Sequence, residues 1–208
     1  MKYTLQEVQE MLNKEIREIK SWAVLRLQDN LDDDSMYQTL IWLSSTQENL
    51  RLLFDNLKEN ETTLLIDSGD IIQGSPLTYY INRIGIEDSN PIVDQMNEFG
   101  YDIWTLGNRE FNYGLEFLSK SFKNFNGDIL CANYGGIETI LDSKPYKIYD
   151  YDGFKLCVIG LSTSHILNWE APENVKGLTF NSIIDTYRKY ESEMVENSDM
   201  IVVNYHGG

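Results

Sequence analysis

Cysteine is scarce in this sequence, with only Cys131 and Cys157 among 208 residues. The two lie too far apart in the chain to form the close pairs typical of zinc knots or of small disulfide scaffolds. Each lies in an apolar run, DILCANY for the first and FKLCVIGL for the second. We therefore expect two buried, reduced thiols, as in a cytoplasmic protein.

Long apolar runs are also missing. No run approaches the ~20 apolar residues that a bilayer span requires, and residues 1–20 carry charges every few positions. The sequence therefore predicts neither a secretory signal nor a membrane anchor. We expect a cytoplasmic location and no membrane partner.

Positive charge is in short supply. Lys and Arg number 17 against 33 Asp and Glu, which gives a net charge of −16 and a pI near 4.4. Such a surface repels phosphate backbones and anionic lipid headgroups, so a nucleic-acid polymer is not expected as a partner. A local pocket that is cationic, or that holds a metal ion, can still bind a nucleotide or another phosphoester.

What is present suffices for a globular α/β domain. Hydrophobic residues make up 42% of the chain and charged residues 24%, close to the averages for folded proteins. A chain of this length can bury a core without help from disulfides. No repeat or low-complexity linker divides it.

Residues 1–21 are expected to form an N-terminal amphipathic helix. Apolar residues recur at three- and four-residue steps from Leu5 to Ile19, and Thr4 with Glu7 forms a capping-box pattern. This helix either packs on the domain surface or docks a partner or a second copy of the chain. Residues 22–208 are expected to form one domain.

Strands and helices alternate along that domain. Helical spacing and proline positions predict helices over residues 36–57, 76–84, 92–99, 112–125 and 183–195. Short apolar runs predict strands over residues 22–27, 63–66, 103–106, 129–132 and 200–203, and residues 147–159 read as a hairpin around Asp152-Gly153.

Three of the predicted strands are followed by side chains that can hold a metal ion. Asp70, Asn108 and His206 each lie beside a glycine at such an end, and the carboxyl ends of strands are where α/β folds place their sites. Oxygen and imidazole donors suit Mn²⁺, Zn²⁺ or Fe²⁺. Each residue alone is also an ordinary turn or surface residue, so the prediction rests on their joint occurrence.

Five motifs in order then resemble the calcineurin-like metallophosphoesterases, in the branch of bacterial 5'-nucleotidases and 2',3'-cyclic-nucleotide phosphodiesterases. They are GDIIQGSPLTYY, GNREFNYG, CANY, VIGLST and NYHGG, within residues 36–208. The resemblance implies a metallophosphoesterase-like α/β/β/α fold, with two sheets flanked by helices and two metals at the strand ends. It further implies that Asp70 bridges both metals and that Asn108 and His206 bind the second.

The sequence departs from that family at three places. The family's first Asp-x-His motif has only Asp29-Asn30-Leu31 as a counterpart, and leucine cannot bind a metal; Asp29 can equally be a solvated loop residue. In GNREFNYG, Arg109 stands where the family has a histidine that donates to the leaving oxygen or steadies the phosphate. Arginine can bind phosphate but cannot act as a general acid near neutrality. The family's later Gly-His-x-His motif would follow Gly208, so we expect a partial domain, incomplete at its C-terminus.

Counting ligands predicts at most one divalent metal site, made by Asp70, Asn108 and His206. The favoured hypothesis is a diverged nucleotidase-like domain that is catalytically impaired. The alternatives are slow single-metal hydrolysis of phosphoesters, with Asn108 and Arg109 holding the phosphate, and a nucleotide- or protein-binding module. Because the domain is expected to be partial, self-association is predicted as well.

Overall fold

The computed structural model describes residues 63–86 and 88–208, and its compact unit runs from Leu64 to Gly208. The predicted helices over residues 4–20 and 36–57, the predicted strand over 22–27, the boundary at residues 21 and 22, and Asp29 all lie outside the described residues. None of the described helices has the length and apolar character of a membrane span.

A parallel sheet forms the first β layer. Its order is β1-β2-β3-β5, with β1 at Ile66–Asp67, β2 at Ile103–Thr105, β3 at Asp128–Leu130 and β5 at Ser143–Lys144. The β1 and β2 register pairs Ile66 with Ile103, and β2 pairs with β3 through Trp104 and Ile129. All their carboxyl ends therefore lie at one edge, which is where the sequence places its polar motifs.

The helices between these strands begin and end at recognisable signals. Helix α3, Pro76–Ile84, starts with a capping box between Ser75 and Thr78 and has proline in its first turn. Helix α4, Pro91–Phe99, is capped by the Asn90 side chain and ends at Gly100 in the left-handed conformation. The predicted order β-α-α-β is confirmed, with bounds that shift by one to three residues at the strands.

The second sheet has the order β6-β7-β9. The predicted hairpin is present as β6, Tyr146–Tyr151, paired antiparallel with β7, Phe154–Ser162. Strand β9, Met200–His206, runs parallel to β7 and is longer than expected, because Asn204, Tyr205 and His206 continue the ladder to Ser162. His206 is thus the last residue of the strand rather than part of a following loop.

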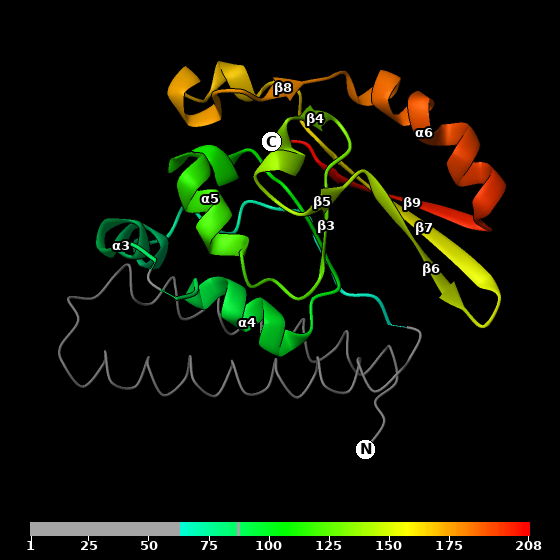
Figure 1. Cartoon of the computed structure of the whole chain (residues 1–208), viewed down its shortest axis with the longest axis horizontal. Coiled ribbons are helices and arrows are strands. Elements are labelled where there is room, and N and C mark those ends of the chain that lie inside the picture. Colours follow the sequence, from blue (N-terminus) through cyan, green and yellow to red (C-terminus); the bar gives the residue numbers. More distant parts are fainter. Residues whose placement is uncertain (1–62, 87) are drawn as a thin grey trace, which may run out of the picture. The chain divides into compact units, whose positions relative to one another are not determined.

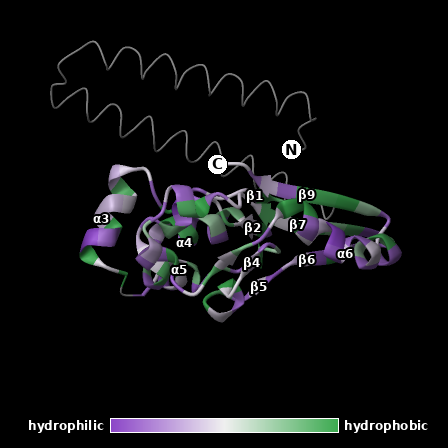
Figure 2. Cartoon of the chain, turned by 90° about the horizontal axis from the view of Figure 1, so that it is seen from above, coloured by the Kyte–Doolittle hydropathy of each residue, from purple (hydrophilic) through white to green (hydrophobic). Residues whose placement is uncertain are grey.

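Alternating side chains on β7 connect the layers. Val158 packs with Ile103 and Leu130 between the two sheets, whereas Cys157 and Ile159 face helix α6. Helix α6, Ile183–Asn197, covers the second sheet through Met194. Helices α4 and α5, the latter at Gly114–Phe122, cover the outer face of the first sheet with Val93, Met96 and Phe117 in the core. Figure 1 shows α4 and α5 on the side of the first sheet and α6 beside β7 and β9. Figure 2 shows apolar colouring on β7 and on the first part of β9, whereas the end of β9 is hydrophilic.

The predicted α/β/β/α arrangement is therefore confirmed, and Cys131 and Cys157 are free and buried as expected. Helix α5 is shorter than the predicted 112–125, because the chain turns after Phe122 and the Phe125 ring packs back against Phe122. The antiparallel ribbon of β4, Tyr134–Gly135, and β8, Thr179–Phe180, was not predicted. Short 3₁₀ helices follow β2, β4 and β7: η1 at Arg109–Phe111, η2 at Ile137–Thr139, and η3 and η4 at Ile166–Asn168 and Pro172–Val175.

Candidate functional site

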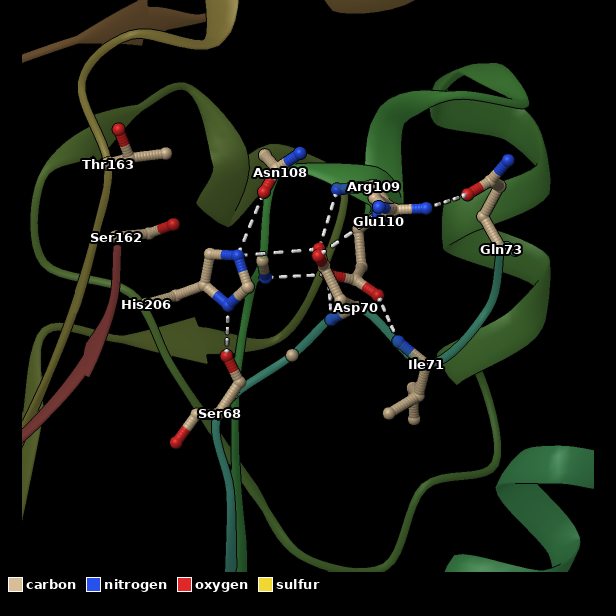
Figure 3. A network of polar contacts seen from close by, with 12 residues as sticks. Ser68, Asp70, Ile71, Gln73, Asn108, Arg109, Glu110, Ser162, Thr163 and His206 are labelled. Atoms are coloured by element: carbon tan, nitrogen blue, oxygen red, sulfur yellow. Dashed lines mark hydrogen bonds and ion pairs between the residues drawn. The ribbon is translucent and has the colours of Figure 1, made fainter. Parts of the chain in front are cut away.

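The ends of two strands of the first sheet and of one strand of the second sheet come together. The loop after β1 carries Asp70, the loop after β2 carries Asn108 and Arg109, and β9 ends at His206. Because β1 and β2 are parallel neighbours, their loops leave the sheet side by side. Figure 3 shows the four side chains gathered around one point.

Two glycines allow the loops to touch through their backbones. Gly69 has a φ of +95°, and a Cβ placed there would lie 2.1 Å from the backbone nitrogen of Gly107. A Cβ on Gly107 would lie 2.3 Å from Oδ1 of Asp70. Both contacts are far shorter than van der Waals distance, so only glycine fits at either position. The close approach brings Asp70 next to Asn108.

The three predicted donors face one another. His206 Nε2 lies 2.9 Å from Oδ1 of Asn108 and 3.5 Å from Oδ1 of Asp70. The other ring nitrogen, Nδ1, lies 2.8 Å from the backbone oxygen of Ser68. A carbonyl can only accept, so Nδ1 carries the hydrogen of this bond, which orients the ring as carbonyls orient metal-binding histidines.

This donor set fits a divalent cation by its chemistry. One imidazole nitrogen, one amide oxygen and one carboxylate oxygen point toward a common centre, and Mn²⁺, Zn²⁺ and Fe²⁺ accept such mixed ligands. Among residues 63–86 and 88–208, no group of three or more His, Cys, Asp and Glu side chains lies close enough to hold a metal. The amide of Asn108 is therefore needed as the third donor.

The guanidinium of Arg109 lies beside the second carboxylate oxygen of Asp70, Oδ2. Its backbone N–H donates to Asp70 Oδ1 over 2.8 Å, and its Nε lies 3.4 Å from Oδ2. The guanidinium also reaches Oε1 of Gln73 at 3.5 Å, and 53% of the side chain is exposed. These contacts are long and solvent-screened, so they hold the guanidinium weakly. It can turn toward an anionic ligand at little cost.

Glu110 supports the site from below, a role that the sequence analysis missed. Its buried carboxylate accepts hydrogen bonds from the backbone N–H groups of Asp70, Ile71 and Gly107, at 2.6 to 2.9 Å. Burial raises the pKa of Glu110 to about 7, although the three donors favour its ionised form. The sequence signal was an acid inside GNREFNYG that directly follows the polar residues of a strand end.

A second unpredicted residue, Asn204, joins the two sheets beneath His206. Its amide nitrogen donates to the Asp67 carbonyl over 3.0 Å and lies 2.8 Å from Oγ1 of Thr105, while its amide oxygen accepts from the Ser68 hydroxyl over 2.7 Å. Burial raises the pKa of the neighbouring Asp67 carboxyl. Asn204 lies in the NYHGG motif, so the motif positions His206 as well as supplying it.

The structure thus places Asp70, Asn108, Arg109 and His206 next to one another, and their roles stay predictions. Asp29, the remaining predicted donor, lies outside the described residues.

Similarity to known proteins covers most of the chain. The chain is 34% identical over 163 residues to the 2',3'-cyclic-nucleotide 2'-phosphodiesterase/3'-nucleotidase of Salmonella typhimurium, which covers 72% of this chain and 25% of that protein. It is 31% identical over 166 residues to the 5'-nucleotidase of Vibrio cholerae, covering 76% of this chain and 29% of the relative. No family model matches the chain.

Comparison of structures agrees with these sequence matches. The calcineurin-like phosphoesterase YfkN from Bacillus subtilis superposes with a TM-score of 0.65 at 31% identity, covering 78% of this chain and 53% of that structure. The chain spans only 25% and 29% of the length of the two relatives above. The activities in their names are therefore properties of those longer proteins and are not assigned to this chain. In fold and ancestry, the chain belongs to the calcineurin-like phosphoesterases, in the branch of 5'-nucleotidases and 2',3'-cyclic-nucleotide phosphodiesterases.

Proposed function

We propose that this chain is a diverged 5'-nucleotidase-like phosphoesterase domain that binds one divalent metal ion and a nucleotide or related phosphoester, with weak or no turnover. The observation that carries the proposal is the surroundings of Asp70. One carboxylate oxygen lies 3.5 Å from Nε2 of His206, which itself lies 2.9 Å from Oδ1 of Asn108, and the other oxygen lies 3.4 Å from Nε of Arg109.

The metal would be held by Asp70, Asn108 and His206. When bound, a divalent ion supplies Lewis acidity to a phosphoryl oxygen. A second ion on the other oxygen of Asp70 would meet the positive charge of Arg109, whose Nε lies 3.4 Å from that oxygen. This repulsion supports a single site.

Arg109 would bind the phosphate and stabilise its negative charge. A guanidinium offers paired N–H donors to phosphate oxygens, and its half-exposed position lets it reach a ligand. It keeps its proton near neutrality, so it cannot supply one to a departing alkoxide. General acid catalysis is typically worth about 10²–10⁴-fold, which supports low turnover.

Slow single-metal hydrolysis of phosphoesters is the second candidate. It is favoured by the way the three donors and Arg109 converge, since metal and phosphate could be bound side by side (Figure 3). The third hypothesis, a binding module that docks through the helix of residues 4–20, depends on residues outside those described and stays a prediction.

Metal content tests the ligand set. Elemental analysis after incubation with Mn²⁺ should give at most one ion per chain, and His206→Ala should remove it. The sequence has two histidines, and the other, His165, is exposed and contacts Thr163. His165→Ala is therefore the matched control and should retain the metal. Two tightly held ions per chain would contradict the ligand count.

Hydrolysis of a chromogenic phosphodiester with Mn²⁺ tests the proposed impairment. The native chain should turn over near the background rate. Arg109→His should not restore brisk turnover, because the histidine would supply a proton without supplying a second Lewis acid. Slow activity that is lost in Asp70→Ala would favour the second candidate. Brisk native activity lost in that variant would overturn the proposal of impairment.

A further inference from the structure

The chain segment after β7 forms one flank of the candidate site. Ser162 ends β7 opposite His206 in the strand register, and residues 163–170 lead from there through η3. Figure 3 shows Ser162 and Thr163 beside His206, on the side away from Arg109 and Gln73. A ligand whose phosphate lies at Arg109 could therefore extend its remainder toward this segment.

The backbone of this segment is held firmly. Ile166 is fully buried, and its carbonyl accepts from the N–H groups of Trp169 and Glu170 at 3.0 and 2.9 Å. The buried Glu170 carboxylate accepts from the side-chain amides of Asn112 and Asn174. Because Asn112 directly follows η1, this carboxylate ties the segment to the loop that carries Asn108 and Arg109.

Two apolar side chains of the anchored segment, Leu167 and Trp169, are more than half exposed. Trp169 is 54% exposed although the residues on either side of its turn, Ile166 and Glu170, are buried. Exposed apolar side chains of this kind are ordinary on a protein surface, so the exposure of Trp169 alone means little. Its location is what matters.

The indole lies beside the candidate donors. A Cβ placed on Gly208 would lie 2.9 Å from Cη2 of Trp169 and 3.8 Å from Oδ1 of Asn108. The distance between Cη2 of Trp169 and Oδ1 of Asn108 therefore cannot exceed the sum of these two distances. The Cη2–Cζ3 edge of the indole therefore borders the site.

We propose that Trp169 is a specificity-determining residue that stacks on the planar base of a nucleotide whose phosphate is bound at Arg109 and the metal site. This inference rests on the proposed function, which supplies the phosphate end of the ligand. An indole offers a flat apolar face that any purine or pyrimidine can cover, and stacking of this kind is worth about 1–3 kcal/mol per base. The anchored backbone reduces the entropy lost when the ring is ordered.

Three probes separate the two ends of the ligand. Calorimetric titration with Mn²⁺ present would measure the binding of inorganic phosphate, adenosine and AMP to the native chain, Trp169→Ala and Trp169→Phe. In Trp169→Ala, the affinities for AMP and adenosine should fall about 5- to 100-fold, and that for inorganic phosphate should not change. Trp169→Phe should retain most of the AMP affinity. Tyr80→Ala, which removes an aromatic ring that is 60% exposed on α3, is the matched control and should bind all three probes normally.

The outcomes distinguish this inference from the proposed function. Equal loss of phosphate and AMP affinity in Trp169→Ala would mean a merely structural role and would overturn the inference, as would unchanged AMP and adenosine binding. If inorganic phosphate did not bind the native chain but adenosine binding still depended on Trp169, the proposed function would be contradicted and the stacking role of Trp169 would be supported. If no probe bound the native chain, both would be wrong.

Discussion

At the scale of single residues, the candidate site depends on a carboxylate that is not itself one of the proposed metal donors. Glu110 accepts three backbone N–H groups from the two loops that carry Asp70 and Asn108. Those donors belong to tight turns whose glycines leave no room for another side chain between them. Buried N–H groups must be paired, so Glu110 determines the relative position of the loops.

Replacing Glu110 with Gln should therefore destabilise the fold and loosen the site. An amide offers one acceptor oxygen, and its NH₂ group would face at least one of the three N–H donors. Leaving a buried donor unpaired costs about 1–3 kcal/mol. Chemical denaturation should show a loss of that size, together with weaker Mn²⁺ binding. As a control, Glu116→Gln changes an exposed acid on α5 that pairs with Lys120 and should leave the free energy of unfolding almost unchanged, because water screens such a pair. Unchanged stability of Glu110→Gln would contradict the supporting role.

The residues that the sequence singles out and those that only the structure shows differ in a physical way. Asp70, Asn108 and His206 could be predicted as neighbours because the carboxyl ends of strands carry polar residues beside glycine. The contacts of Glu110 and Asn204 could not be predicted, because they depend on which backbone groups lie within about 3 Å of each side chain. That information comes only from the folded arrangement of loops from separate strands.

At the scale of elements, the pattern predicts long elements well and short ones poorly. The 9-residue helices α3 and α4 have caps and proline at their starts, and β6 and β7 are long strands on either side of the tight turn at Asp152-Gly153. The two-residue strands β4, β5 and β8 have no periodicity to detect. The last strand was predicted too short because its final residues, Asn204 to His206, look like a polar loop in the sequence yet pair with β7.

One side-chain cluster connects the strands of the two sheets and should respond to pH. Asp128 on β3 pairs with Lys144 on β5, at 3.2 Å, and with Lys147 on β6, and it accepts from the Tyr149 hydroxyl over 3.0 Å. Burial opposes its ionisation, but the hydrogen bonds from both lysines and from Tyr149 outweigh this. The pKa of Asp128 is therefore held below its ordinary value of 3.8.

A depressed pKa makes this cluster stabilising at neutral pH and weak in acid. The ionised form is favoured in the folded state, so its contribution is complete above pH 3.8 and is lost as the pH falls through the lower folded-state pKa. Asp128→Asn should lower the free energy of unfolding by about 1–2 kcal/mol at pH 7. The difference from the native chain should shrink between pH 4 and pH 2, as measured by urea denaturation at each pH. A difference that stayed constant down to pH 2 would show that the carboxylate charge is not responsible.

At the scale of the whole molecule, exposed apolar surface and net charge act in opposite directions. Strand β9 lies at the end of its sheet in the described part of the chain, paired only with β7. Met200, Val203 and Tyr205 on this strand are 53%, 47% and 48% exposed. An edge strand with apolar side chains favours pairing with another chain, whereas a net charge of −16 disfavours it.

We therefore predict self-association that increases with both protein concentration and salt. Near 0.05 M NaCl the like charges of two copies repel over more than about 10 Å, and near 0.5 M this range falls to about 4 Å. Multi-angle light scattering should give a mass close to the 24.1 kDa of one chain in low salt, and a larger mass in high salt. Val203→Lys should suppress the increase, because it places a charge on the exposed edge. Val195→Lys adds the same charge at a position on α6 that is 61% exposed and serves as the control. If both lysine variants associated like the native chain, contact through β9 would be wrong, and a single-chain mass under all conditions would exclude self-association altogether.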